Sequence, residues 1–287
     1  MRLAFKTKPE HIGWDHMLAT WQELDADERY DSAWTFDHFY PIYGGDDGSC
    51  LESWVTLGAL AQATTRIRVG SMVNAAPYRH PGLFAAMAST LDIVSCGRLE
   101  LGLGCGWNLN EAGAYGIDIG SVKDRQDRFS EYLQCVRSLL SEPVTDFAGR
   151  FYTLTGARNE PKGPQQPAPP IVIGGTGPKR TLPLVAQHAD HWNYPGVPVA
   201  GGPAEGLRAG LDRLAECCDE IGRDPAEIVS STHIFYSPAE PLDGPVAEAS
   251  ALRDAGLDIA ILYPSDAGYT PESVHDAADA FEHLLGD

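Results

Sequence analysis

A histidine flanked by an acid and an aromatic residue is the first place in the sequence where chemistry is expected. Asp37, His38 and Phe39 come directly after an apolar, strand-like stretch. An imidazole can donate or accept a proton near neutral pH, and a neighbouring carboxylate can fix the orientation of the ring. An Asp-His pair at the end of a strand can also be purely structural, and the tripeptide alone does not separate the two alternatives.

Small residues follow the next two apolar stretches. The run from Gly70 to Pro81 would let backbone approach a flat ligand, and a proline suits the first turn of a helix, although an ordinary loop has the same composition. The run from Gly102 to Glu111 has glycines at alternate positions. Leu109 occupies the place where a dinucleotide-binding fingerprint needs its last glycine, so that motif is excluded.

A third glycine-rich run, from Gly174 to Arg180, precedes a predicted helix and ends in two cations. Exposed N–H groups at the start of a helix, with a hydroxyl and positive charges nearby, are suited to a phosphate group. A plain glycine turn explains the same residues, and both alternatives stay open.

Charge and cysteine usage exclude several classes of function. The net charge of −19 leaves no general basic surface for nucleic acid or for an anionic membrane, so an anionic cofactor would need a local group of cations. The six cysteines lack the paired spacing of a zinc site and are expected to be free thiols, which predicts no metal centre. Their positions are 50, 96, 105, 135, 217 and 218.

Apolar stretches are short throughout the chain. The longest, 57–63 and 257–263, fall far below the roughly 20 residues that cross a bilayer. The N-terminal residues carry no apolar run of signal-peptide length. We therefore expect a soluble, cytoplasmic protein.

Strand-like and helix-like segments alternate along the chain, which is typical of parallel α/β folds. Strands are predicted at 3–6, 31–37, 67–73, 99–104, 171–173, 191–193, 228–235 and 259–263, and helices at 15–28, 51–64, 83–94, 129–140, 181–188, 203–221, 245–254 and 271–285. Eight of each within 1–287 favours a single-domain (β/α)8 TIM barrel over a doubly wound open sheet. In such a barrel the active site lies where the strands end.

One segment breaks this alternation. Residues 143–170 contain six prolines and are too long for an ordinary barrel connection, which suggests a lid or an insertion loop. Together with the loop at 40–50, this segment is expected to frame the substrate pocket.

Four motifs in order make the chain recognisable: Phe36-Asp37-His38-Phe39, Tyr78-Arg79-His80-Pro81, the stretch 95–107 and the stretch 170–177. Together they resemble the luciferase-like monooxygenase family, and in particular its branch of coenzyme F420-dependent oxidoreductases. Members of that family are (β/α)8 barrels, so the resemblance supports the barrel.

The resemblance also implies roles for individual residues. Asp37 and His38 would be catalytic and lie beside the reactive edge of a flavin or deazaflavin ring, with His38 exchanging the proton. Met72-Val73 would form a bulge that backs the ring and contains a non-proline cis peptide. The residues implied in cofactor binding are Met72, Val73, Asn74, Gly106, Trp107, Gly174, Gly175, Thr176 and Gly177. Some sugar dehydrogenases of the family carry an acid where Trp107 stands, which argues against a sugar-phosphate substrate.

These roles predict hydride transfer between coenzyme F420 and an organic substrate. The alternatives are a two-component monooxygenase that takes reduced FMN from a separate reductase, and a catalytically silent flavin-binding paralogue. Six cations are candidates for holding the anionic tail of the cofactor: Lys6, Lys8, Arg79, Lys162, Lys179 and Arg180. Relatives are commonly homodimers, and a flavin or F420 reductase is a possible partner.

Overall fold

Parallel strands close into a ring in the computed structural model, which describes residues 1–196, 200–265 and 268–286. The strands of the ring are β1 (Arg2–Lys6), β2 (Tyr30–Thr35), β3 (Arg68–Ser71), β4 (Asn74–Ala75), β5 (Leu99–Gly104), β8 (Ile171–Gly174), β9 (His191–Tyr194), β10 (Val229–Tyr236) and β11 (Ile259–Pro264). Strand β1 pairs with both β2 and β11, and β3 pairs with β5, so the sheet has no free edge. The predicted barrel is confirmed, and the open sheet is excluded.

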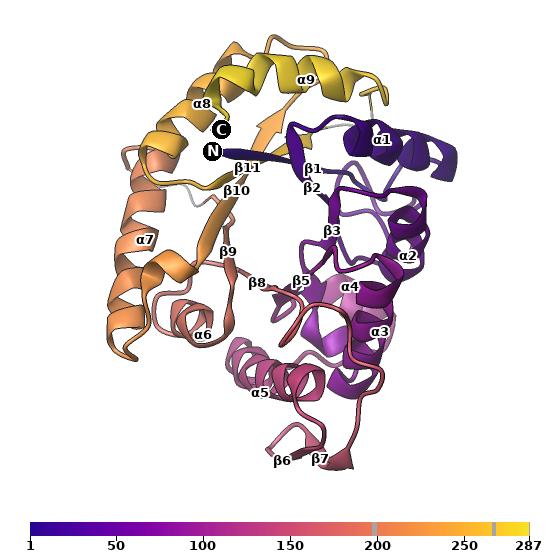
Figure 1. Cartoon of the computed structure of the whole chain (residues 1–287), viewed down its shortest axis with the longest axis vertical. Helices are drawn as coiled ribbons and strands as arrows, with labels where there is room; N and C mark the ends of the chain where they lie inside the picture. Colours follow the sequence, from indigo (N-terminus) through magenta and orange to yellow (C-terminus); the bar gives the residue numbers. More distant parts are fainter. Residues whose placement is uncertain (197–199, 266–267, 287) are drawn as a thin grey trace.

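Helices surround the ring, and the two chain ends lie close together (Figure 1). They are α1 (Trp14–Ala26), α2 (Ser53–Ala63), α3 (Pro81–Val94), α4 (Leu109–Ala114), α5 (Val122–Ser141), α6 (Thr181–His188), α7 (Pro203–Asp219), α8 (Asp243–Asp254) and α9 (Ser273–Phe281). Helix α4 is short and follows β5 directly; the sequence pattern did not predict it. Among the described helices, none is long and apolar enough to cross a membrane.

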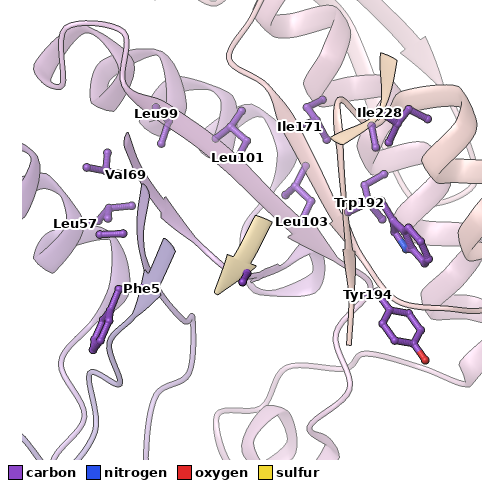
Figure 2. Close-up of a cluster of buried hydrophobic side chains, with 14 of the residues drawn as sticks. Phe5, Leu57, Val69, Leu99, Leu101, Leu103, Ile171, Trp192, Tyr194 and Ile228 are labelled. Carbon is purple, nitrogen blue, oxygen red and sulfur yellow. The ribbon is translucent and has the colours of Figure 1, made fainter. Parts of the chain in front are cut away.

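Side chains of each strand alternate between the helical layer and the inside of the barrel. On β5, Leu99, Leu101 and Leu103 belong to the large cluster that packs between strands and helices (Figure 2). A second, smaller cluster comprises Ala4, Trp34, Met72, Val172, Ile259 and Ile261. Because the outward leucines supply the packing, the inward positions of the same strands can carry polar or very small residues.

Glycines on β5 allow a close approach of the neighbouring strand. A Cβ on Gly102 would lie 2.0 Å from the carbonyl oxygen of Ser71, which no side chain tolerates. Directly after Ser71 the Met72–Val73 peptide bond is cis, as the resemblance implied, and the bend separates β3 from β4. The predicted strand 67–73 is therefore interrupted at the mouth of the barrel.

Two helices differ from the sequence prediction. Helix α7 ends at Asp219, two residues before the predicted end, and Ile221 is 49% exposed. On α3, Leu83, the first residue of the predicted helix 83–94, is 57% exposed, whereas Phe84 and Ala88 are buried. Alanines form part of the buried face of α3. A prediction that counts only large apolar residues therefore places this face one residue away from its true position.

The proline-rich segment 143–170 lies outside the barrel. It begins with an antiparallel hairpin, β6 (Thr145–Ala148) and β7 (Thr153–Ala157), next to α5 (Figure 1). Further on, the Gln165 side chain donates to Asp92 Oδ1 (2.7 Å) and to the carbonyl oxygen of Leu99 (2.8 Å), at the first residue of β5. This later part of the segment thus reaches the end of the barrel opposite the strand ends. None of the described residues that line the cavity at the strand ends comes from 143–170, contrary to the expectation that this segment frames the substrate pocket.

We predict that Gly102→Ala destabilises the protein by about 1–3 kcal/mol, because the added methyl group displaces Ser71 and the bend that follows it. Denaturation in urea measures the effect. Gly58→Ala on α2 is the matched control: its Cβ meets no atom within 4 Å, and it should stabilise by roughly 0.5–1 kcal/mol. Equal stability of the two variants would contradict the close approach.

Candidate active site

A cavity of about 410 Å³ lies at the carboxyl ends of the strands, where a barrel enzyme is expected to work. The residues that line it come from β1, β4, β5, β8, β10, β11 and the segments that follow β2, β3, β4, β5 and β9. Seven of the residues predicted from sequence are among them: Asp37, His38, Met72, Val73, Gly106, Trp107 and Gly174. The loop at 40–50 contributes Ile42 and Tyr43, as expected.

His38 is held by a buried carboxylate from α4. Its Nδ1 lies 2.6 Å from Glu111 Oε2, and the Glu111 side chain is fully buried. The Tyr78 hydroxyl donates to the same oxygen (2.8 Å), and the backbone N–H of Phe39 donates to Oε1. Three donors from two loops thus converge on one acid.

These contacts decide the protonation of the site. Burial alone would raise the pKa of Glu111, but the hydrogen bonds from His38, Phe39 and Tyr78 outweigh it and bring that pKa below its usual value. An ionised carboxylate only accepts hydrogen bonds, so His38 Nδ1 must carry the proton that it donates. His38 Nε2 has no partner in the described part of the chain and is the nitrogen available to a ligand in the cavity.

Asp37 does not orient His38. Arg79 donates to both of its carboxylate oxygens, at 2.7 and 3.0 Å, and the backbone N–H of Ala75 donates at 3.3 Å. Burial raises the pKa of Asp37, and the guanidinium of Arg79 opposes that shift. The acid that we expected to fix the imidazole instead ties the loop after β2 to the loop after β4, and Glu111 takes the orienting role.

One wall of the cavity has almost no side chains. Val73 lies between two glycines: a Cβ on Gly104 would be 2.8 Å from Val73 Cγ2, and a Cβ on Gly174 would be 3.6 Å from Cγ1. Gly106, at the rim, has a φ of +78°, which L side chains rarely adopt. This smooth wall fits the flat face of a tricyclic ring such as a flavin or deazaflavin.

The exposed ring of Trp107 borders the same space. It meets the His38 imidazole edge to face, with ring centroids 5.6 Å apart. Asn74, also expected near the ring, is not part of the cavity lining. Its side chain donates to the carbonyl oxygen of Gly102 (2.7 Å) and accepts from Trp54 (2.7 Å), so it fastens β4 in place.

The predicted phosphate loop lies beside the cavity. Of the loop residues 174–180, Gly174 alone is part of the cavity lining. The N–H groups of Thr181 and Leu182 already donate to the carbonyl oxygen of Gly177 (2.9 and 3.0 Å). The N–H groups of Thr176 and Gly177 have no acceptor among the described residues. These two groups, rather than the first turn of α6, could hold a phosphate.

Four of the six candidate cations for an anionic tail are engaged in other contacts. Arg79 binds Asp37 and Glu52. Lys162 donates to two carbonyl oxygens at the end of α5, away from the mouth. Arg180 pairs with Asp127, and Lys8 donates to Ser265.

The sequence interpretation missed the lining residues of β10 and β11 and the buried acid behind His38. His233 on β10 and Tyr263 on β11 line the cavity, and no motif marks them. Lys6, at the end of β1, also lines it and was one of the six candidate cations. For Glu111 a signal existed: Asn108, three residues earlier, accepts from the Glu111 N–H (3.2 Å) and caps α4. An Asn-x-x-Glu sequence is typical of a helix start and would place the acid in a first turn facing the mouth.

Comparison with known proteins identifies the family. Residues 14–282 match the family described as luciferase-like monooxygenase. The chain belongs to the luciferase-like monooxygenase family. Members of this family are F420- or flavin-dependent oxidoreductases, which agrees with a cavity that has one smooth wall and a histidine at its edge.

Named relatives share moderate identity with this family member. An F420-dependent hydroxymycolic acid dehydrogenase of Mycobacterium tuberculosis is 32% identical over 79% of this chain and 60% of its own length. An F420-dependent glucose-6-phosphate dehydrogenase of Kineococcus radiotolerans is 29% identical over 83% of this chain and 73% of its own. An uncharacterized M. tuberculosis protein is 35% identical over 50% of this chain; the chain spans about half the length of that relative.

Solved structures of low sequence identity share the fold. An F420-dependent secondary alcohol dehydrogenase in complex with an F420-acetone adduct superposes with a TM-score of 0.83, at 20% identity and 98% coverage of both chains. The monooxygenase RslO1 from Streptomyces bottropensis gives 0.74, at 20% identity, over 99% of this chain and 98% of its own. The same barrel thus occurs in a dehydrogenase and in a monooxygenase.

We predict that Glu111→Gln destabilises the protein by about 2 kcal/mol at pH 7, because the carboxamide loses the charge that binds three donors. The pKa of Glu111 is depressed in the folded state, so its stabilising effect exists above the unfolded pKa and is lost as the pH falls through the folded value. Urea unfolding at pH 7 and pH 3.5 should therefore show the variant approaching the wild type in acid. The exposed substitution Glu205→Gln is the control, and a Glu111→Gln deficit that does not depend on pH would contradict the assignment.

Proposed function

We propose that this protein transfers a hydride between coenzyme F420 and an organic substrate, with His38 exchanging the accompanying proton. The observation that carries the proposal is that His38 Nε2 and the smooth wall of Val73, Gly104 and Gly174 share one cavity. Several relatives are named F420-dependent dehydrogenases, and these names support the choice of cofactor.

Coenzyme F420 would supply a deazaflavin ring that accepts or delivers a hydride. The protein contributes position and a proton. Val73 and the two glycines would hold one face of the ring, and Trp107 would cover part of its edge. His38, fixed through Nδ1 by Glu111, presents Nε2 to the substrate oxygen or carbon that gains or loses a proton.

The fixed tautomer decides which proton transfer the neutral His38 ring can carry out. With its proton on Nδ1, the neutral ring accepts a proton at Nε2 and becomes an imidazolium that the ionised Glu111 stabilises. This direction corresponds to the oxidation of an alcohol: the base removes the hydroxyl proton while a hydride leaves the carbon. In the reverse direction the imidazolium returns the proton to the carbonyl oxygen.

A reduced-FMN monooxygenase is the second candidate, since the family contains both chemistries. A pyrimidine monooxygenase from Caulobacter is 31% identical over 62% of this chain and 49% of its own length. The smooth wall suits either ring.

Difference absorption spectra separate the two candidates before any substrate is known. We predict that titration with oxidised F420 gives a saturable change at a one-to-one ratio, whereas FMN gives a weaker change or none. A Gly174→Val variant would be titrated in parallel. Its larger side chain intrudes on the smooth wall and should weaken F420 binding. Tight binding of reduced FMN without any F420 response would overturn the proposal in favour of the monooxygenase.

Replacing His38 tests the proton transfer. His38→Ala should lower turnover by roughly 10²–10⁴ because the general acid or base is lost, while the F420 titration stays close to that of the wild type. His80→Ala is the control: this histidine caps α3 and lies outside the cavity lining. Turnover that survives His38→Ala would remove the imidazole from the mechanism even if F420 binds.

A further inference from the structure

A buried lysine and a partly buried histidine meet in the cavity, on strands that lie across the barrel from the glycines of β5 and β8. Lys6 ends β1 and His233 lies on β10; Lys6 Nζ is 3.4 Å from His233 Nε2. Lys6 is 6% exposed, and in the described ranges no carboxylate lies within ion-pair distance of its ammonium. A buried cation is normally paired with an acid, so this arrangement needs an explanation.

Other lysines of the chain show what a structural role looks like. Lys8, two residues on, donates to the carbonyl oxygen of Ser265 at 2.6 Å. Lys162 donates to the carbonyl oxygens of Leu139 (2.7 Å) and Glu142 (2.8 Å). Lys6 instead has the imidazole of His233 as its hydrogen-bond partner (3.4 Å), which can accept a hydrogen bond but carries no negative charge to balance the ammonium.

Aromatic rings surround the pair. Lys6 Nζ lies 4.7 Å from the centre of the Tyr263 ring and 5.9 Å from that of Phe36. The Phe235 ring is 5.1 Å from that of Tyr263 and is half exposed at the rim of the cavity. Together these rings form an apolar surface with one basic spot at its base.

The charge state follows from this environment. Burial lowers the pKa of Lys6 to about 7, repulsion from Lys8 adds to the effect, and Glu10 opposes it. Burial and the neighbouring Lys6 hold the pKa of His233 well below its usual range. At neutral pH the pair is therefore close to losing its charge unless an anion occupies the space in front of it.

We propose that Lys6 and His233 bind a carboxylate of the substrate, with the apolar body of that substrate packed against Phe36, Phe235 and Tyr263. Assigning the ligand as the substrate rests on the proposed function; the anion site itself does not. The substrate class is then a small organic acid with an apolar or aromatic body.

The position of the pair suits a substrate rather than the cofactor ring. The glycine wall is on β5 and β8, whereas the basic pair is on β1 and β10, and all of them line the same cavity. Phe36 lies between the basic pair and the histidine that exchanges the proton. Its ring is 5.3 Å from the His38 ring and 5.9 Å from Lys6 Nζ. A molecule held by Lys6 and lying along Phe36 would present its far end to His38.

Calorimetric titration of the full chain with sodium benzoate and with neutral benzamide tests the anion site without knowledge of the substrate. We expect benzoate to bind and benzamide to bind more weakly. At pH 8, where Lys6 is mostly uncharged in the free protein, benzoate binding should take up a proton, seen as a heat that depends on the buffer. At pH 6 this uptake should largely vanish. Equal affinity for the two probes, or no proton uptake at pH 8, would overturn the proposal.

The variant Lys6→Met tests whether Lys6 is the group that binds the carboxylate of benzoate. It removes the charge while keeping an unbranched chain, and it should weaken benzoate binding by about 30-fold or more, the loss expected when one partner of a buried charge pair is removed. The exposed Lys123→Met is the control and should bind like the wild type. Circular dichroism and urea unfolding confirm that each variant is folded.

F420 titrations of the same proteins separate this proposal from the proposed function. If Lys6→Met loses benzoate binding but retains F420 binding, the pair is a substrate site. If Lys6→Met instead weakens F420 and leaves benzoate unchanged, the pair belongs to the cofactor and the proposal is wrong. If the wild type binds benzoate but no F420, the proposed function fails while the anion site stands.

Discussion

The carboxylate of Glu111 receives hydrogen bonds from the imidazole of His38, the backbone of Phe39 and the hydroxyl of Tyr78. A buried negative charge is costly unless its oxygens are occupied by donors, so this acid requires the loops after β2 and β4 to meet α4 at one point. That requirement fixes the imidazole and leaves Nε2 facing the cavity. The ion pair of Asp37 with Arg79 joins the same two loops from the other side.

The barrel makes this convergence possible because its packing is carried on the outside. Outward leucines of β5 build the core, while inward positions of the same strand hold Gly102 and Gly104. On the opposite strands the inward positions carry Lys6 and His233. The cavity therefore has one wall without side chains and one wall of basic and aromatic groups, and His38 lies between the two.

Much of the fold could be predicted from the sequence, because each strand and helix depends on local periodicity. The cis bond at Met72–Val73 was implied by the resemblance to the luciferase-like family, and the position of His38 at a strand end followed from a short motif. The partners of these residues did not: His38 and Glu111 are 73 residues apart, and Lys6 and His233 are 227 apart. Their contacts depend on the register and closure of the barrel, which no local pattern contains. Asp37 was misassigned for the same reason, since its partner Arg79 lies 42 residues away.

The tautomer of His38 tests the account most directly. Nitrogen-15 NMR of histidine-labelled protein at pH 8, with the His38 signals assigned by comparison with a His38→Gln variant, reports which ring nitrogen carries the proton. The account predicts a proton on Nδ1, held by Glu111, and a bare Nε2. A proton on Nε2 would contradict it, because the nitrogen that faces the cavity could then no longer accept a proton from a substrate.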